Sequence, residues 1–453
     1  MKTVDVASVL DEGRWSGYQK FLVVATALTI ILDGLDNQLL GAAVPALMRE
    51  WGVARSALAP VLTAGMVGMA VGGFIGGFVG DRLGRRVALL GSVVSFGLLT
   101  IMVSFAGSVF ALGMLRFFAG LGLGGAMPNA AALASEYVPR RKRPFAVTLT
   151  IVCIPLGGSL AGLVGGQILP RFGWRALFLV GGIVPLVLTA VLLKVLPESP
   201  RYLARLPERW PELAALLRRL GHDVPGDAVF VDPTEKSVSR ASVRELFLPE
   251  FRGDTVALCG SFFFCLLAVY VGANWVPSML SGAGFDVGTA SYGLTAFNLG
   301  GVVGAILGAV LIMRLGSRLT MLVMAAGAIA GAAVLAAMSI GPQSAASVLA
   351  MLAWTGGLIN AVQTTMYALA AHVYPTSIRA TGVGTTVAFG RLGGVLSPSV
   401  GSWALESGGA SRYFGLIASM MTLAFIALAS VNRHIPGVSK KAVVPLPAEP
   451  ARH

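Results

Sequence analysis

Hydrophobic residues gather along this chain into twelve long runs that are separated by polar stretches. Each run is close to 20 residues long, about the length of helix that crosses roughly 30 Å of hydrocarbon. The pattern therefore predicts an all-α integral membrane protein with twelve transmembrane helices, near residues 20–44, 57–80, 87–106, 109–133, 146–170, 174–196, 254–281, 290–313, 319–339, 345–371, 382–408 and 411–432.

Composition agrees with this prediction. Of the 453 residues, 55% are hydrophobic and only 12% are charged, and the mean hydropathy of +0.79 exceeds that of an ordinary soluble domain. About 20 polar residues precede the first run, and no small-residue cleavage pattern follows it. We therefore expect the first run to be a retained helix and not a signal peptide.

A long polar gap divides the twelve runs into six and six. The predicted organisation is a six-helix bundle over residues 1–196, a linker over 197–253, a second six-helix bundle over 254–432 and a tail over 433–453. Within the linker, Glu212–Leu220 is expected to form an amphipathic helix at the membrane interface, and 243–247 a second short helix. We expect the linker to be a solvated connector, with partner binding as the alternative.

The two halves resemble one another weakly. Residues 77–86 after the second run correspond to 312–318 after the eighth, and 137–139 after the fourth correspond to 373–375 after the tenth. Two parallel repeats are implied, with a substrate path where they meet. Glycines recur every three or four residues between Gly65 and Gly80, which predicts that the second helix approaches a neighbour closely.

The net charge of +13 would suit nucleic acid, but the placement of the basic residues argues for a lipid bilayer instead. Of the 34 Lys and Arg residues, 27 lie in the two termini and the even-numbered loops, and only five lie in the odd-numbered loops. This positive-inside asymmetry predicts that both termini are cytoplasmic. The other two, Arg116 and Arg391, fall inside apolar runs.

Two carboxylates, Asp33 and Asp36, lie in the middle of the first run. A carboxylate at this depth costs roughly 2.5 to 3.5 kcal/mol on insertion scales, so it is expected to have a function. Three residues apart on a helix, the two side chains are predicted to share one face. We expect that face to line a water-filled path and to exchange protons, although a structural pair satisfied by neighbouring helices is the alternative.

The intramembrane arginines are the positive counterparts of these acids. A guanidinium in a span must pair with an acid, a carbonyl or a ligand, and it matches a carboxylate in bidentate geometry. Arg391 is the better candidate for binding a substrate carboxylate, and Arg116 for pairing with Asp36 or Glu136, although the reverse assignment stays open. The expected pocket also has polar and aromatic candidates, among them Asn274, Trp275, Gln363 and Tyr367.

Charged residues and glycines also cluster in the loops that are predicted to face the cytoplasm. Such a cluster can hold one side shut and yield as the halves rock. The expected gating residues, with Asp81 placed near the start of the third helix, are Gly77, Asp81, Arg82, Gly84, Arg85, Arg86, Glu136 and Arg379. The three cysteines and four histidines lack metal-site spacing, and no nucleophile and base pair is evident, so neither a metal site nor an enzyme is expected.

The segment Gly77–Arg86 resembles the signature loop of the major facilitator superfamily. Within that superfamily, the chain is similar to the aromatic acid:proton symporters, on the stretches 32–36, 116–124, 127–137, 196–202, 274–277, 378–382 and 390–393. It departs from their pattern at Met313, where such symporters often carry an acid in the second signature loop.

The resemblance implies the major facilitator fold and import of a benzoate, hydroxybenzoate or hydroxyphenylpropionate by proton symport. The proton is then the coupling ion, with no other cofactor, and the protein works as a monomer in a bacterial-type inner membrane. The rival interpretations are a proton-coupled exporter or a carrier of another organic anion or drug on the same scaffold and, more remotely, a membrane chemoreceptor that does not transport.

Overall fold

The computed structural model describes residues 3–13, 15–222, 224–225, 228–231, 242–375 and 377–437. Within these ranges, ten helices are long and apolar enough to span a membrane. They account for all twelve predicted runs because α6 (Arg143–Val195) and α13 (Arg379–Ala429) each contain two runs. The break in α6 is at Gly173, and the break in α13 is at Gly408 and Gly409. Gly173 and Gly409 have positive φ, which a residue without Cβ adopts readily.

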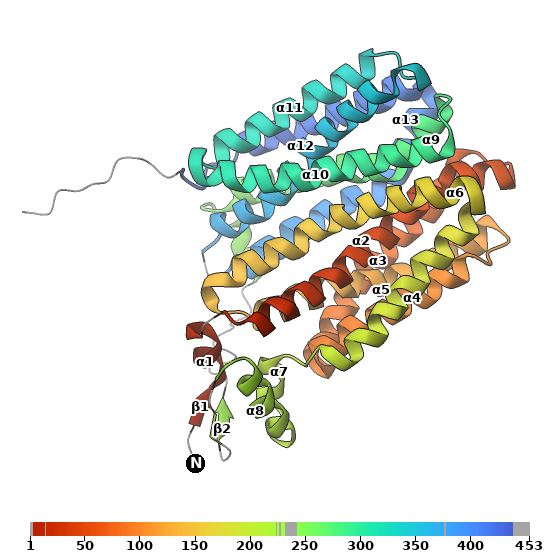
Figure 1. The fold of residues 1–453 in the computed structure, drawn as a ribbon. Helices are drawn as coiled ribbons and strands as arrows, with labels where there is room; N and C mark the ends of the chain where they lie inside the picture. The colour runs from red at the N-terminus through yellow and green to blue at the C-terminus, as the bar shows by residue number, and fades with distance from the viewer. Residues whose placement is uncertain are drawn as a thin grey trace, which may run out of the picture.

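The two halves repeat the same packing (Figure 1). In the first half, α2 packs on α6 and α3 packs on α5; in the second half, α9 packs on α13 and α10 packs on α12. The remaining long helices are α4 in the first half and α11 in the second. The bounds are Gly17–Trp51 for α2, Arg55–Leu83 for α3, Arg85–Val103 for α4, Val109–Glu136 for α5, Arg252–Gly282 for α9, Val287–Leu315 for α10, Ser317–Ala337 for α11 and Ala345–Val373 for α12.

Glycine allows the paired helices to touch through their backbones. A Cβ added to Gly72 of α3 would lie 2.1 Å from the carbonyl oxygen of Leu121 in α5. A Cβ on Gly300 of α10 would lie 1.9 Å from the carbonyl oxygen of Ala353 in α12. The predicted close approach of the second helix is therefore confirmed, and the second half has an equivalent contact.

The signature loop and its counterpart are both short turns at a glycine. Gly84 separates α3 from α4 with φ 107°, and Gly316 separates α10 from α11 with φ 82°. Asp81 belongs to the last turn of α3, so its expected place near the start of the following helix is wrong. The reason is that α3 continues as far as Leu83, and only the glycine after it interrupts the helix.

The linker and the N-terminal segment form a small assembly at one end of the bundles (Figure 1). Strand β1 (Thr3–Asp5) pairs in parallel with β2 (Val229–Val231). Around them lie α1 (Val6–Glu12), α7 (Pro200–Ala204) and α8 (Trp210–Arg219). The described residues also form short 3-10 helices: η1 (Arg140–Lys142), η2 (Pro207–Arg209), η4 (Val243–Phe247) and η5 (Pro342–Ser344).

Helix α8 was expected to turn its apolar face to the membrane interface, but protein covers that face. Its residues Leu213 and Leu217 are fully buried in one apolar cluster with Val6 and Leu10 of α1. The N-terminal segment therefore covers the face that was expected to meet lipid. The short helix expected at 243–247 is present as η4. Linker residues 223, 226–227 and 232–241, and tail residues 438–453, lie outside the described part of the chain.

The molecule thus has two distinct ends. We call the end with this assembly the linker end; it also carries the turns at Gly84 and Gly316. We call the opposite end the far end; it carries the turns at Gly52 and Gly173 and the break at Gly408 and Gly409.

Candidate substrate and proton site

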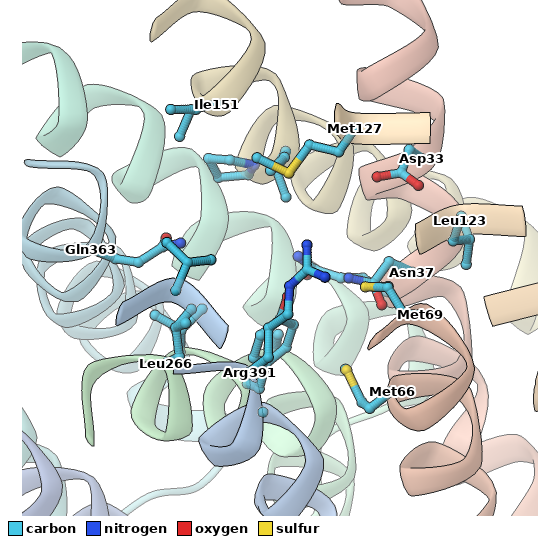
Figure 2. A pocket seen from close by; sticks show the side chains of 18 of the residues that line it. Asp33, Asn37, Met66, Met69, Leu123, Met127, Ile151, Leu266, Gln363 and Arg391 are labelled. Atoms are coloured by element: carbon cyan, nitrogen blue, oxygen red, sulfur yellow. The ribbon is translucent and has the colours of Figure 1, made fainter. Parts of the chain in front are cut away.

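A cavity lies between the two halves near the middle of the long helices (Figure 2). About 1010 Å³ of space in and around it is free of protein atoms, and part of that space is open to solvent. Apolar side chains such as Met66, Met69, Met127 and Leu266 form much of its wall. The polar and charged side chains that reach it come from both halves: Asp33, Asn37, Gln38, Tyr270, Asn298, Asn360, Gln363, Tyr367 and Arg391.

Arg391 and Asp33 are the two charged residues that line this cavity. Arg391 extends from α13 toward the first half, and a Cβ on Gly73 of α3 would lie 2.6 Å from its Nη1 atom. Among the described residues, Arg391 forms no hydrogen bond or salt bridge. Asp33 is 7% exposed, and its buried Oδ1 atom has no hydrogen-bond partner. A cation and an acid without bonded partners among the described residues therefore face the same cavity.

Asp36 occupies a different environment from Asp33. It is fully buried and accepts hydrogen bonds from Thr100 Oγ1 at 2.6 Å and Arg116 Nη1 at 3.2 Å. Arg116 also donates to the backbone oxygen of Asp36 at 3.2 Å. Of the two acids proposed for Arg116, Asp36 is therefore the one it contacts, whereas Glu136 accepts from the hydroxyl of Ser199.

The expectation that both acids line one water-filled face is wrong for Asp36, which is absent from the cavity wall. Residues three apart on an α-helix differ by about 60° in direction. This angle is enough to turn Asp36 toward α4 and α5 while Asp33 faces the second half. The structural pair that was the alternative interpretation is present at Asp36.

This buried pair predicts a large loss of stability in Asp36→Asn. Removing one partner leaves the Arg116 charge buried without its acid, at a cost of about 3 to 5 kcal/mol. We expect the purified variant to lose its folded, monodisperse form at a lower temperature than wild type, and Asp36→Leu combined with Arg116→Leu to recover much of that loss. Asp33→Asn, one turn away, is the matched control. Equal heat stability of the Asp36→Asn and Asp33→Asn variants would contradict the assignment.

The other predicted binding residues divide between two cavities. Gln363 and Tyr367 line the central cavity. Arg116 and Asn274 line a smaller one, which shares Asn37 with the central cavity. Asn274 Nδ2 also donates to Ser397 Oγ at 3.3 Å.

Trp275 is not in the wall of either cavity, so its predicted role is not supported. Its side chain is fully buried, and its indole N–H donates to the carbonyl oxygen of Pro398 at 3.1 Å. The cause is helical geometry, because adjacent residues point about 100° apart and the cavity lies on the Asn274 side. Trp275 is therefore a packing residue between α9 and α13.

Sequence reasoning missed two polar neighbours of the acid pair, Asn37 and Gln38. Gln38 and Asn298 exchange two hydrogen bonds, of 3.2 and 2.7 Å, and thereby join the two halves beside the cavity. Both side chains are buried. Their position in the same apolar run as the aspartates could have identified them, because a buried amide in a membrane span also requires hydrogen-bond partners.

The charged cluster at the linker end binds the first half to the linker. Asp81 Oδ1 pairs with Arg85 Nη2 at 2.6 Å across the turn at Gly84. The backbone N–H of Arg86 donates to Glu198 Oε1 at 2.9 Å. Glu198 was missed as a site residue, although it lies in a stretch already noted for family likeness.

The remaining predicted gating residues make local contacts. The guanidinium of Arg82 lies 4.2 Å from the ring centre of Phe78, and Arg379 Nε donates to the backbone oxygen of Tyr374 at 3.3 Å. A Cβ on Gly77 would meet open space. These contacts stay within one half each, so they restrain loop geometry more than they join the halves.

Tyr137 connects the end of α5 to the linker. Its hydroxyl donates to the carbonyl oxygen of Pro197 at 2.5 Å. Burial, with the nearby carboxylates of Glu198 and Glu136, raises the pKa of Tyr137 well above its usual value. The phenol therefore keeps its proton and remains a hydrogen-bond donor to the linker.

We expect Asp81→Asn to reduce transport and to leave membrane insertion intact. The Asp81 side chain is 63% exposed and that of Arg85 is 24% exposed, and such pairs are worth about 0 to 1 kcal/mol. The initial uptake rate should fall by no more than about fivefold at equal membrane abundance. Normal uptake would remove the gating role from Asp81.

Hydrogen bonds join the two halves at the far end. Arg55 Nε of α3 donates to Ser278 Oγ of α9 at 2.9 Å, and Arg49 Nη2 donates to Ser281 Oγ at 3.2 Å. The backbone N–H of Ser56 donates to Glu406 Oε1 of α13 at 2.8 Å. The central cavity is thus closed from the far end by contacts between α2 and α3 on one side and α9 and α13 on the other.

Two repeated bundles of membrane-spanning helices around a shared central cavity define the architecture of a multi-pass membrane transporter. The sequence pattern of the Major Facilitator Superfamily matches residues 26–398 and, in a second match, 258–451. The chain belongs to this superfamily.

Known relatives cover most of the chain. The gallate transporter of Pseudomonas putida is 34% identical over 408 residues, which are 89% of this chain and 90% of the relative. The 4-hydroxybenzoate transporter of Pseudomonas aeruginosa is 33% identical, over 90% of this chain and 91% of the relative. The 3-(3-hydroxy-phenyl)propionate transporter of Escherichia coli is 33% identical, over 82% of this chain and 83% of the relative.

Solved structures show the same fold. The xylose transporter of Escherichia coli in an inward open conformation has a TM-score of 0.71 at 17% sequence identity, covering 93% of this chain and 98% of that one. A D-xylose-proton symporter has a TM-score of 0.66 at 19% identity, over 91% and 97% of the two chains. At this identity the likeness concerns the fold alone.

Proposed function

We propose that this protein imports an aromatic carboxylate together with protons by alternating access. One observation carries the proposal: Arg391 and Asp33, each without a bonded partner among the described residues, face one cavity between the two halves. A guanidinium with free donors matches a carboxylate, and an apolar wall of methionine and leucine side chains suits a ring. The names of the relatives, transporters of gallate, 4-hydroxybenzoate and hydroxyphenylpropionate, support the same class of substrate.

The two charged residues have complementary roles in this mechanism. A proton on Asp33 removes the negative charge opposite Arg391, so the cavity then attracts an anion. The ring packs against Met66, Met69 and Met127, and the amides and hydroxyls of the wall orient its substituents. Loss of the proton restores the negative charge of Asp33, which weakens the hold of Arg391 on the substrate and favours its release.

The same proposal places the linker end in the cytoplasm of a bacterial-type inner membrane, as the distribution of basic residues predicts. In this orientation the far end, where hydrogen bonds join the two halves, faces outward. An inward proton gains about 2.3 kcal/mol per net charge per 100 mV of membrane potential, which can drive accumulation. The protein is proposed to work as a monomer, because each half supplies one of the two charges and both halves belong to one chain.

Uptake into proteoliposomes with an imposed pH gradient tests this function. We expect labelled benzoate, 4-hydroxybenzoate, gallate or hydroxyphenylpropionate to accumulate when the outside is acidic, and a protonophore to abolish the accumulation. Preloading with unlabelled substrate should accelerate uptake, which a receptor that does not transport cannot do. If the protonophore does not change uptake, transport is not coupled to protons. If the pH gradient drives the substrate out, the protein is an exporter. Failure to carry any of these acids would overturn the substrate class.

A further inference from the structure

The far end contains a third cavity, which the proposed mechanism does not use. It lies between the last turns of α2 and α9 and the start of α3, and about 560 Å³ there is free of protein atoms, including space open to solvent. Arg49 and Arg55 line it from the first half, and Ser278 and Ser281 line it from the second. Two of the few basic residues at this end therefore share one cavity at the boundary between the halves.

Both arginines are bonded to neutral acceptors. Arg55 donates to Ser278 Oγ at 2.9 Å and to the carbonyl oxygen of Ser278 at 3.2 Å, and Arg49 donates to Ser281 Oγ at 3.2 Å. Within the described ranges, neither arginine forms a salt bridge. A carboxylate is a stronger acceptor for a guanidinium than a hydroxyl or a carbonyl, and it accepts two parallel bonds from one arginine.

The nearby acids have other partners. Glu50 accepts from Arg175 Nη1 at 2.5 Å and from the indole N–H of Trp174 at 2.7 Å. Glu406 acts on Arg55 electrostatically, but its Oε1 atom accepts from the backbone of Ser56 at 2.8 Å. Two cations and no acid line the cavity itself, and Glu50 and Glu406 lie outside its wall.

Each of the three cavities has at least one arginine in its wall. Helix α2 lines all three cavities, with Arg49 in the far-end cavity, Asn37 in the smaller cavity and Asp33 in the central cavity. Arg116 lines the smaller cavity and Arg391 the central one. Asp33 and Arg49 are 16 residues apart, so the three cavities span about 24 Å along α2. A guanidinium is therefore present at each of three successive depths.

We propose that Arg49 and Arg55 form a receiving site at the far end, where the carboxylate of the substrate binds before it reaches Arg391. This inference rests on the proposed function, because it requires that the substrate is an aromatic carboxylate. The carboxylate replaces Ser278 as the acceptor for Arg55 and thereby breaks a contact that holds α3 to α9. Since the anion binds better where Arg55 is free, the substrate itself favours opening of the far end.

Initial uptake rates in proteoliposomes test the receiving site. In Arg49→Gln combined with Arg55→Gln, we expect the KM for labelled 4-hydroxybenzoate to rise about tenfold or more, because a focusing charge is lost. Uptake by wild type at low substrate concentration should fall as salt is added, and this dependence should be absent from the double variant. Arg412→Gln is the matched control, since Arg412 is an exposed arginine near the same end that lines none of the three cavities.

Two further variants distinguish a substrate-binding site from a purely structural contact between the halves. Ser278→Ala removes the hydroxyl that accepts from Arg55 and leaves the backbone carbonyl oxygen as the weaker competitor, so we expect a lower KM. If Arg55 only joined the halves, Ser278→Ala would instead behave like Arg55→Gln. Arg49→Lys with Arg55→Lys keeps the charge and should restore the salt dependence, which also shows that the protein is folded. A double glutamine variant that matches Arg412→Gln in KM and salt dependence would overturn the receiving site. Absence of any uptake by wild type would instead overturn the proposed function.

Discussion

Arg391→Gln is expected to abolish high-affinity binding of aromatic carboxylates. Without the guanidinium, the carboxylate of the substrate would enter a largely apolar cavity whose wall has no other cation. Truncating one partner of a buried charge pair costs about 2 to 5 kcal/mol, which corresponds to a loss of affinity from roughly 30-fold to several thousand-fold. Arg391→Lys keeps the charge but loses the bidentate fork, so we expect an intermediate loss.

Binding of labelled benzoate or 4-hydroxybenzoate to the purified variants measures this effect. The uncharged benzamide is a matched control ligand, because it has the same ring and no charge for Arg391 to bind. We expect Arg391→Gln to bind benzamide as well as wild type does. If the variant also retains its affinity for the carboxylates, the anion is bound elsewhere, and Arg116 becomes the next residue to test.

The positions of the long apolar helices were predictable because they depend on local properties of the chain. Runs of about 20 apolar residues are needed to cross a bilayer whatever their neighbours are, so the helices could be located from hydropathy alone. The internal repeat was also visible, because the turns at Gly84 and Gly316 both require a residue that tolerates positive φ. Even the two merged helices, α6 and α13, break at or beside the predicted boundaries.

The direction of individual side chains was harder to predict than the helices that carry them. Asp33 and Asp36 are three residues apart, but Arg116 and Thr100 approach only Asp36. Asn274 and Trp275 are adjacent, yet only Asn274 reaches a cavity. Each outcome depends on which neighbouring helix lies against which face, and an all-round apolar helix does not show this in its own sequence.

The linker shows the same limit in another form. The apolar stripe of α8 predicts burial, but it does not say whether lipid or protein covers it. The cover is the N-terminal segment, about 200 residues earlier in the chain, which pairs through β1 with β2. Contacts between segments so distant in sequence have no local signal.

Asp33→Asn is expected to uncouple transport from the proton gradient. An amide keeps the shape of the carboxylate but does not take up and release a proton in the cycle, so the site opposite Arg391 is permanently neutral. A pH difference of one unit supplies about 1.4 kcal/mol per proton, which supports roughly tenfold accumulation. We expect the steady-state ratio of inside to outside substrate in the Asp33→Asn variant to fall to about one.

Counterflow distinguishes this loss of coupling from a simple loss of activity. Exchange of labelled for unlabelled substrate requires the halves to rock but no net proton movement, so Asp33→Asn should still exchange. Asp36→Asn is the matched control, because the same chemical change one turn away should lower heat stability through Arg116 and not abolish accumulation in the protein that remains folded. If the Asp33→Asn variant still accumulates substrate against a gradient, another group carries the coupled proton. If the variant with both Asp33→Asn and Asp36→Asn still does so, neither acid of α2 takes part in coupling.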